Sequence, residues 1–418
     1  MPHNLTKKTH RFLRYTQKYT GTDNIYLLQG GGWLTLGQLI SSVSAFLLAI
    51  VFANFLPKET YGTYRYVMSL TGIIAILALP GMTQAIIRAV AQRNEGSFIE
   101  GFRAKLRWGL LTTPISLIFA GYYFVNQNSV LGFSFLLAAL FLPVMDAFGH
   151  YHSFLHGKKL FAESTKYLSL TQIISAAILA LTALITDNIF AILAAYFAAS
   201  TALRILFFLI TVKKFPRNKN RDSRAIPFGK HLSLLSLFGI VSVNIDKILI
   251  FHYLGAAELA IYIFAIAVPD QIRMLVKNIP KLALPKFSRK SPTEIKASIY
   301  KKIFLITLAM IPVVAIYFFA APYIYKLLFP QYLESINFSR AFAFILLAGA
   351  GGLPAAALKS QMAIKQSYIL DIFTAMSQIL LMLVFLITGY GIWGIVMGRV
   401  IGRFLSLGVS LMLIKRLL

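Results

Sequence analysis

Twelve apolar stretches of membrane-spanning length constrain this 418-residue chain more than any other feature of its sequence. A helix needs about 20 predominantly apolar residues to cross the hydrocarbon core of a bilayer. Such stretches lie at approximately 33–56, 66–90, 106–125, 130–155, 167–186, 188–212, 231–254, 259–285, 302–321, 338–358, 367–388 and 391–414. The intervals between them are too short for a folded soluble domain, so we expect the function to reside within the membrane. The sequence therefore predicts an all-α polytopic membrane protein with about twelve transmembrane helices.

The composition agrees with this prediction and excludes several kinds of site. Only 13% of the residues are charged, whereas soluble domains carry about 25%. Cysteine is absent, which rules out disulfides, iron–sulfur clusters and thiolate metal sites. The histidines show no metal-ligand spacing with carboxylates, so we expect no metal. A net charge of +27 would suit nucleic acid, but no basic stretch is long enough to fold as a soluble domain, and we expect no such partner.

Lysine and arginine are distributed very unevenly among the predicted loops. The two tails and the even-numbered loops are basic, whereas the odd-numbered loops hold only Lys58 and Lys326. Cytoplasmic loops collect these residues in membrane proteins. We therefore expect both termini to be cytoplasmic, in a multi-pass protein of a bacterial or archaeal cytoplasmic membrane. The basic and polar first 30 residues predict no cleaved signal peptide.

A weak internal repeat divides the chain into two halves. One shift along the chain aligns Leu56 with Leu254 and Tyr64 with Tyr262, each pair lying between two spans. The shift covers six spans, so both halves have the same orientation, as in repeats related by an axis along the membrane normal. We predict a pseudo-two-fold pair of six-helix lobes, with a cytoplasmic tail at 1–32, an N-lobe at 33–212, a basic cytoplasmic linker at 213–230 and a C-lobe at 231–418.

Charged and polar side chains inside the predicted spans are the candidate functional residues. A charge at mid-bilayer depth costs about 2.5–3.5 kcal/mol on insertion scales, and such residues usually face the bundle interior or a wet cavity. The two spans that open the second half carry Asn244, Asp246 and Lys247, and Asp270, Arg273 and Lys277. The second set recurs at i, i+3 and i+7 and so shares one helix face. A structural ion pair in each span is the alternative to a functional role.

Two other spans carry further cationic candidates. Arg65 and Arg88 lie near the two ends of the second span, where the alternatives are an interfacial anchor and a cytoplasmic charge. Arg399 and Arg403 share one face of the last span. About 18 Å of helix separates Arg403 from the cytoplasmic end of that span, at 1.5 Å per residue. Because a side chain cannot extend that far, we expect this pair to face protein or water.

Three stretches of the sequence carry a resemblance to a known family. They are VFANFLPKETYGTY at 51–64, LPGMTQAIIRAVA at 79–91, and NIDKILIFHYLG at 244–255, which Ile261 and Tyr262 follow. Together with twelve spans, cytoplasmic termini and two lobes, they make the chain similar to the Wzx-type polysaccharide flippases. These belong to the multidrug/oligosaccharidyl-lipid/polysaccharide exporter superfamily.

The resemblance implies two lobes around a central cavity and a transport function rather than an enzymatic one. Such proteins move undecaprenyl-pyrophosphate-linked oligosaccharides to the outer leaflet by alternating access. The number of spans is smaller than is usual in peptidoglycan-precursor flippases, which implies an O-antigen of lipopolysaccharide, a capsule, an exopolysaccharide or a teichuronic-type substrate. Membrane lipids, a polysaccharide polymerase and a chain-length regulator are the expected partners.

On this hypothesis the cations bind the diphosphate, because a guanidinium fork can bond two oxygens at once. The substrate-binding candidates are Arg273, Lys247, Lys277, Arg399, Arg403, Arg88 and Arg65, of which Arg88 matches the arginine that closes a family motif. The candidates for ion coupling or pairing are Asp246, Asp270, Asn244, Asp146 and Asp371. We expect no cofactor other than a coupling proton or sodium ion.

Two other functions remain as alternatives. A cation-coupled drug or metabolite antiporter of the same fold would typically use acidic groups in its cavity, whereas cations outnumber acids within these spans. A membrane glycan polymerase would need a long outer loop with paired carboxylates or with arginine and histidine. The longest predicted outer segment, near 322–337, offers only Lys326 and Glu334.

Overall fold

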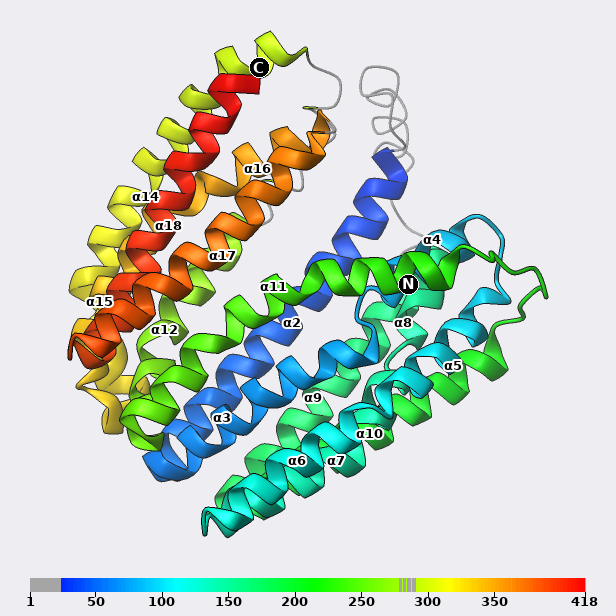
Figure 1. Cartoon of the computed structure of the whole chain (residues 1–418), viewed down its shortest axis with the longest axis horizontal. Coiled ribbons are helices and arrows are strands. Elements are labelled where there is room, and N and C mark those ends of the chain that lie inside the picture. Colours follow the sequence, from blue (N-terminus) through cyan, green and yellow to red (C-terminus); the bar gives the residue numbers. More distant parts are fainter. Residues whose placement is uncertain are drawn as a thin grey trace, which may run out of the picture.

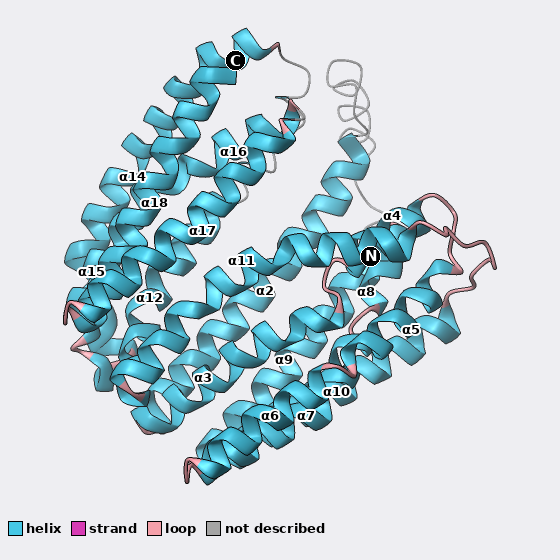
Figure 2. Ribbon diagram, in the orientation of Figure 1, coloured by secondary structure: helices cyan, strands magenta, loops and turns pink. Residues whose placement is uncertain are grey.

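The computed structural model describes residues 24–277, 280, 283, 287, 291–361 and 363–417, most of them with their side chains. These residues form helices joined by short turns, and no strand occurs among them (Figure 2). The predicted all-α polytopic fold is confirmed. The predicted tail at 1–32 lies mostly outside the described residues.

The described residues of the first half, from Asn24 onward, form nine α-helices and one short 3-10 helix. They are α2 (Asn24–Phe55), α3 (Lys58–Ile74), η1 (Ala75–Ala78), α4 (Met82–Ala91), α5 (Ser97–Gly109), α6 (Thr112–Val125), α7 (Ser129–Phe148), α8 (Tyr151–Gly157), α9 (Phe161–Ile185) and α10 (Ile189–Lys214). α5 and α6 form one span of 29 residues that begins at Ser97, well before the predicted start at 106.

The second half begins with two long helices and ends with another antiparallel pair. It comprises α11 (Ala225–Leu254), α12 (Ala256–Lys277), α14 (Pro292–Leu328), η2 (Pro330–Tyr332), α15 (Ser335–Ala343), η3 (Phe344–Gly351), α16 (Gly352–Ser360), α17 (Ile364–Ile387) and α18 (Gly391–Leu417). A capping box at Ser291 and Glu294 starts α14, because each side chain satisfies a free backbone N–H of the first turn.

The second predicted span is broken into two helices. α3 with η1 and α4 meet at an angle of 47°. Leu79 has a left-handed backbone at this break, with φ of 55°, and Pro80 has no N–H with which to continue the helix. Counting this bent pair as one span, the described residues contain eleven candidate spans. α12 overlaps the predicted span at 259–285 but is not among these candidates, and Glu258, Asp270 and Arg273 make it less apolar. The described residues therefore do not contain all of the predicted twelve spans.

The two bundles join at one end of the molecule and spread apart toward the other (Figure 1). α5–α10 form one bundle and α12 and α14–α18 form the other, with α2, α3 and α11 between them. α11 packs on α3 and α4 of the first half and on α12 and α17 of the second. We refer to the end with segments 56–57, 255 and 329–334 as the closed end, and to the opposite end, which carries the basic segments, as the basic end.

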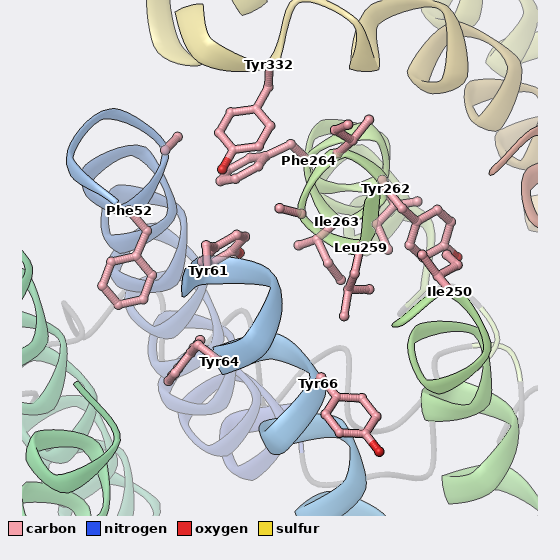
Figure 3. Close-up of a cluster of buried hydrophobic side chains, with 14 of the residues drawn as sticks. Phe52, Tyr61, Tyr64, Tyr66, Ile250, Leu259, Tyr262, Ile263, Phe264 and Tyr332 are labelled. Atoms are coloured by element: carbon pink, nitrogen blue, oxygen red, sulfur yellow. The ribbon is translucent and has the colours of Figure 1, made fainter. Parts of the chain in front are cut away.

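An aromatic cluster fills the closed end, with Phe52, Tyr61, Phe264 and Tyr332 buried together (Figure 3). The ring of Tyr61 stacks on that of Phe264 with centroids 4.9 Å apart, so α3 and α12 pack tightly. Close by, a Cβ on Gly62 would meet the carbonyl oxygen of Ala256 at 1.8 Å. Only glycine lets these two backbones approach so closely.

Polar contacts also link the two halves at the closed end. Lys58 forms an ion pair with Glu334. The side-chain amide of Asn54 donates to the carbonyl of Leu328 at 3.1 Å, and that of Gln331 donates to the carbonyl of Asn54 at 3.0 Å. Toward the basic end, none of the described helices α14, α16 and α18 packs extensively against α4–α10. The contacts between the halves therefore concentrate at the closed end and along α11.

Candidate functional site

Asp246 lies fully buried in the second half of α11, where three side chains contact its carboxylate. The hydroxyl of Tyr262 on α12 donates to Oδ2 at 2.6 Å, and a guanidinium N–H of Arg399 on α18 donates to the same oxygen at 2.8 Å. The Arg399 guanidinium also donates to the Tyr262 hydroxyl at 2.8 Å. Lys247 Nζ lies 3.3 Å from Oδ1. The network ties three helices of the second half together, since its side chains come from α11, α12 and α18. These partners offset the cost of burying the carboxylate charge.

Two cations share this one carboxylate, which leaves a positive charge in excess. Lys247 is itself buried, and its ammonium also donates to the carbonyl of Val243 at 2.5 Å. The Arg399 guanidinium stands over the ring of Phe342, 5.3 Å from its centroid. A cation over an aromatic face gains electrostatic stabilisation. The side chains of Lys247 and Arg399 are therefore held by several partners each.

Further charges surround this network. Arg273 pairs with Asp270 at 3.1 Å, one helical turn away on α12. Arg403 lies close enough to Arg273 and Arg399 to interact with them electrostatically, and Arg65 on α3 is similarly close to Lys247. We define the central charge cluster as Arg65, Asp246, Lys247, Asp270, Arg273, Arg399 and Arg403. Arg65 comes from the first half of the chain and all the others from the second.

The central charge cluster has five cations and two carboxylates, so positive charge dominates. Among the described residues, neither Arg65 nor Arg403 has a carboxylate within ion-pair distance, and Nε of Arg65 is buried without a hydrogen-bond acceptor. Buried donors normally have partners. The arrangement is therefore suited to a ligand that brings several anionic oxygens.

The structure places Arg88, Asn244, Asp146 and Asp371 outside this cluster. Arg88 on α4 stands over the Phe228 ring of α11 at 5.3 Å, toward the basic end. The amide of Asn244 donates to the carbonyl of Ile240 at 2.9 Å. Asp371 is exposed and pairs with Lys359 at 3.5 Å. The side chain of Lys277 lies outside the described residues.

Asp146 belongs to a second polar site, inside the first half of the chain. It lies 3.7 Å from Arg204 in a cavity of about 320 Å³ that Lys105 and His150 also line. Lys105 is not among the sequence candidates, because the predicted third span begins at 106 and leaves this lysine in a loop. The apolar residues at 98, 99 and 102 are the signal in the sequence that the helix starts earlier.

Tyr262 is the other residue that the sequence candidates missed. Two signals in the sequence mark it, because its position matches that of Tyr64 in the internal repeat and it follows the motif at 244–255. The two tyrosines differ in the structure, since Tyr262 bonds to Asp246 while Tyr64 packs against aromatic rings. Within the described part of the chain, no group of three or more His, Cys, Asp or Glu side chains is placed to hold a metal ion.

Comparison with known sequences identifies a family for most of the chain. The sequence model of a family described as polysaccharide biosynthesis protein matches residues 27–289, which include the second-half motif at 244–255. The resemblance predicted from the three motifs is confirmed at this level. Among curated proteins, none matches the chain.

Solved structures show that the fold is shared with transporters. A multidrug resistance MATE family transporter of the MOP superfamily, in an inward-facing conformation, has a TM-score of 0.62 at 15% identity, covering 93% of this chain and 97% of its own. The lipid II flippase MurJ, in an inward closed conformation, has a TM-score of 0.70 at 14% identity, covering 91% and 87%. A MOP superfamily transporter from Pyrococcus furiosus, described as having a binding pocket of reverse polarity, has a TM-score of 0.57 at 14% identity, covering 94% and 93%. Identities this low show the fold alone.

Proposed function

Because the chain belongs to the polysaccharide biosynthesis protein family, we propose that it moves oligosaccharide units linked to undecaprenyl pyrophosphate across the cytoplasmic membrane. The glycan would be a unit of a surface polysaccharide of the lipopolysaccharide, capsule or exopolysaccharide class. The central charge cluster is the observation that carries the proposal, since its positive surplus suits the diphosphate of such a lipid. The protein would perform no covalent chemistry.

Within the cluster, the least committed guanidinium groups are the proposed diphosphate ligands. These are Arg65, Arg273 and Arg403, whereas Arg399 and Lys247 are engaged by Asp246. Two opposite unit charges 4 Å apart attract by about 4 kcal/mol at an effective dielectric constant of 20. Several such contacts would offset the loss of water around the diphosphate.

Alternating access would use the two ends of the molecule differently. The contacts between the halves concentrate at the closed end, and the bundles spread toward the basic end (Figure 1). We place the basic end and both termini in the cytoplasm, following the distribution of lysine and arginine. The substrate would then enter the central charge cluster from the cytoplasmic side and leave after the closed end opens.

We place ion coupling, by protons or sodium ions, at Asp270 rather than at Asp246. Asp246 is fully buried and contacted by three donors, so it has no free position for an ion. Asp270 is about one-third exposed, and Arg273 is its ion-pair partner among the residues that the structure describes. Binding of a diphosphate to Arg273 would weaken that pair and free the carboxylate, which would couple the ion to the substrate.

The proposal is tested in a polysaccharide-producing strain that lacks its own copy of this protein. The variant Arg273→Gln/Arg403→Gln should reduce surface polysaccharide at least tenfold and accumulate the lipid-linked precursor. A lost charge-assisted hydrogen bond is worth about 1.5–3 kcal/mol, and 1.4 kcal/mol corresponds to tenfold. Lys166→Gln, an exposed surface cation on α9, is the matched control and should export normally.

Two results would count against the proposal at different levels. Wild-type export by the double variant would remove the central charge cluster as the substrate site. Normal export in the strain without any copy of the protein, with no precursor accumulation, would reject the flippase function itself. A polymerase and a chain-length regulator remain the proposed partners, to be sought by cross-linking in the same strain.

A further inference from the structure

The cavity of about 320 Å³ inside the first half of the chain is separate from the central charge cluster. It lies between α2, the break before α4, α5, the junction of α7 with α8, α9 and α10. Polar side chains from several of these helices line it, including Ser41, Lys105, Asp146, Thr171, Gln172 and Arg204. A polar cavity with convergent charged groups is the usual form of a ligand site.

Lys105 is the side chain in this cavity that most requires a ligand. It is only 6% exposed on α5, and among the described residues its ammonium makes no hydrogen bond and no ion pair within 4 Å. Asp146 and Arg204 are close enough to act on it electrostatically, and their effects oppose each other. A buried ammonium without an anion is unfavourable. An anion in the cavity would remove that penalty.

Other polar atoms of the cavity also lack partners. Oδ1 of Asp146 lies 3.7 Å from Arg204, while its Oδ2 is buried without a hydrogen bond. Nε2 of His150 is likewise buried and unpartnered, although its Nδ1 lies 3.1 Å from the Ser153 hydroxyl. The Arg204 guanidinium donates to the carbonyl of Met145 at 3.0 Å. Buried polar groups of this kind are normally satisfied, so the cavity is suited to a ligand that carries hydroxyl groups as well as charge.

We propose that this cavity binds an acidic sugar residue of the transported glycan, with the carboxylate of a hexuronate on Lys105. This inference rests on the proposed function. Lys105 and Arg204 against Asp146 leave one positive charge in excess. That balance suits a carboxylate, whereas the central charge cluster, with its larger surplus, suits a diphosphate. Thr171 and Gln172 would bond the sugar hydroxyls.

The size and position of the cavity agree with this occupant. About 320 Å³ corresponds to roughly ten water molecules at their liquid volume, which is room for one sugar ring and not for a long glycan. Ser41 lines the cavity, and its neighbour Ser42 contacts the sulfur of Met274 on α12 at 3.3 Å. The cavity wall on α2 therefore borders the surface between the halves. A glycan whose diphosphate occupies the central charge cluster would extend past this wall.

Binding of free sugars to the purified full-length protein tests the site directly. D-glucuronate should bind, D-glucose should bind at least tenfold more weakly, and inorganic phosphate should not compete, as measured by calorimetry in detergent. Lys105→Gln should weaken glucuronate binding at least tenfold. Arg107→Gln removes an exposed cation two residues away on the same helix and should bind as the wild type. Gln172→Leu changes a cavity side chain for which no hydrogen bond to another described residue is found, and it should weaken binding about threefold. This second variant keeps the test valid if Lys105→Gln does not fold.

Each binding result bears on a different part of this proposal. Glucuronate binding that survives both Lys105→Gln and Gln172→Leu would overturn it, and so would absence of binding to the wild type. Equal binding of glucose would reject the role of the charge, and competition by phosphate would reassign the cavity to inorganic anions.

A transport experiment distinguishes this inference from the proposed function. In matched strains, Lys105→Gln should reduce export of a uronate-containing glycan at least tenfold and leave a neutral glycan unaffected. An equal loss for both glycans would reject the acidic-sugar site while retaining the flippase. Export of neither glycan by the wild type would reject the proposed function, whereas glucuronate binding by the purified protein would still report on the cavity.

Discussion

At the residue scale, Asp246 organises the charges around it. Without this carboxylate, Lys247 and Arg399 would be two buried cations with no anion between them, which is strongly unfavourable. The hydroxyl of Tyr262 bonds to both Asp246 and Arg399, so it fixes the direction of the guanidinium. Asp246 is thus a positioning residue, and among the described residues Arg65 and Arg403 are the cluster's arginines that have no carboxylate partner.

Replacing Tyr262 with phenylalanine should destabilise this network without changing the packing of the ring. The hydroxyl donates to a carboxylate and accepts from a guanidinium, and a hydrogen bond to a charged group contributes about 1.5–3 kcal/mol. We expect a loss of that size in the free energy of unfolding, read as a lower Tm of the purified protein. Tyr253→Phe, at an exposed tyrosine one residue before the end of α11, should have no effect. Equal Tm values for the two variants would contradict the role of the Tyr262 hydroxyl.

The charged residues were predictable individually, but their partners were not. An ionised group within an apolar run is visible in the sequence, which is why Asp246 and Arg399 were both candidates. Their pairing joins positions 153 residues apart and depends on how α11 and α18 pack. Lys105 was missed because the start of its helix was predicted at 106 and lies at Ser97, and helix boundaries are the least predictable part of an element.

At the element scale, helix length and helix breaks followed closely from composition. The apolar runs predicted where most of the long helices lie, because a bilayer-spanning helix needs a fixed length, although the described residues contain eleven candidate spans at most rather than twelve. The bend of 47° in the second span falls at the Leu-Pro-Gly run at 79–81, where proline lacks the N–H that would continue the helix. What the runs did not predict is the bridging position of α11, since its contacts with α3, α4, α12 and α17 depend on tertiary packing. The predicted division between lobes at 213–230 therefore stays a prediction.

Gly62 is the position where α3 and α12 approach most closely, and Gly62→Ala should force them apart. The added Cβ would overlap the carbonyl of Ala256, and overpacking of this kind costs about 1–3 kcal/mol. We expect a lower Tm of the purified protein and a larger distance between spin labels on α3 and α12. Gly121→Ala on α6, where a Cβ meets nothing within 4 Å, should be neutral or slightly stabilising, because alanine is the better helix former. An unchanged distance in Gly62→Ala would show that the contact is not tight.

The segment before α11 is held to the first half by Glu95, which makes its docking sensitive to acid. Burial alone would raise the pKa of Glu95, but the hydrogen bonds from the Lys158 ammonium at 2.5 Å and the Asn218 backbone at 2.9 Å lower it overall. A folded-state pKa below the unfolded one means that the stabilisation is complete above about 4.3, the usual value for glutamate. It is then lost as the pH falls through the lower folded value.

We therefore expect the wild type and Glu95→Gln to differ in their rate of proteolysis by an amount that depends on pH. Proteolysis within 215–224 should be faster in the variant at neutral pH, and the difference should shrink as the pH falls below about 4.3. Glu59→Gln, at an exposed glutamate, should follow the wild type at every pH. A constant difference between Glu95→Gln and the wild type across this range would show that the carboxylate charge is not what holds the segment.

At the scale of the whole molecule, the two ends are built from different chemistry. The closed end combines buried rings with the exposed ion pair between Lys58 and Glu334, whereas lysine and arginine dominate the other end. Rings gain most of their energy from burial, so separating them is the main cost of opening. The ion pair adds little, because exposed pairs contribute about 0.2–1 kcal/mol. An ion pair of this strength is suited to adjusting the balance between the closed and opened forms of this end.

Reversing the charge of Lys58 should shift that balance in a measurable way. Lys58→Glu turns the attraction to Glu334 into repulsion, and a change of 1 kcal/mol corresponds to about fivefold in population. The chain has no cysteine, so a single Ile263→Cys on α12, at a side chain buried in the closed end, reports opening through its rate of maleimide labelling. We expect labelling up to about fivefold faster in Lys58→Glu and a return toward the original rate in Lys58→Glu/Glu334→Lys. Lys326→Glu makes the same charge change at an exposed position of α14 and should label like the parent. If the double variant labelled as fast as Lys58→Glu, the ion pair would have no part in keeping this end closed, and the aromatic cluster alone would account for it.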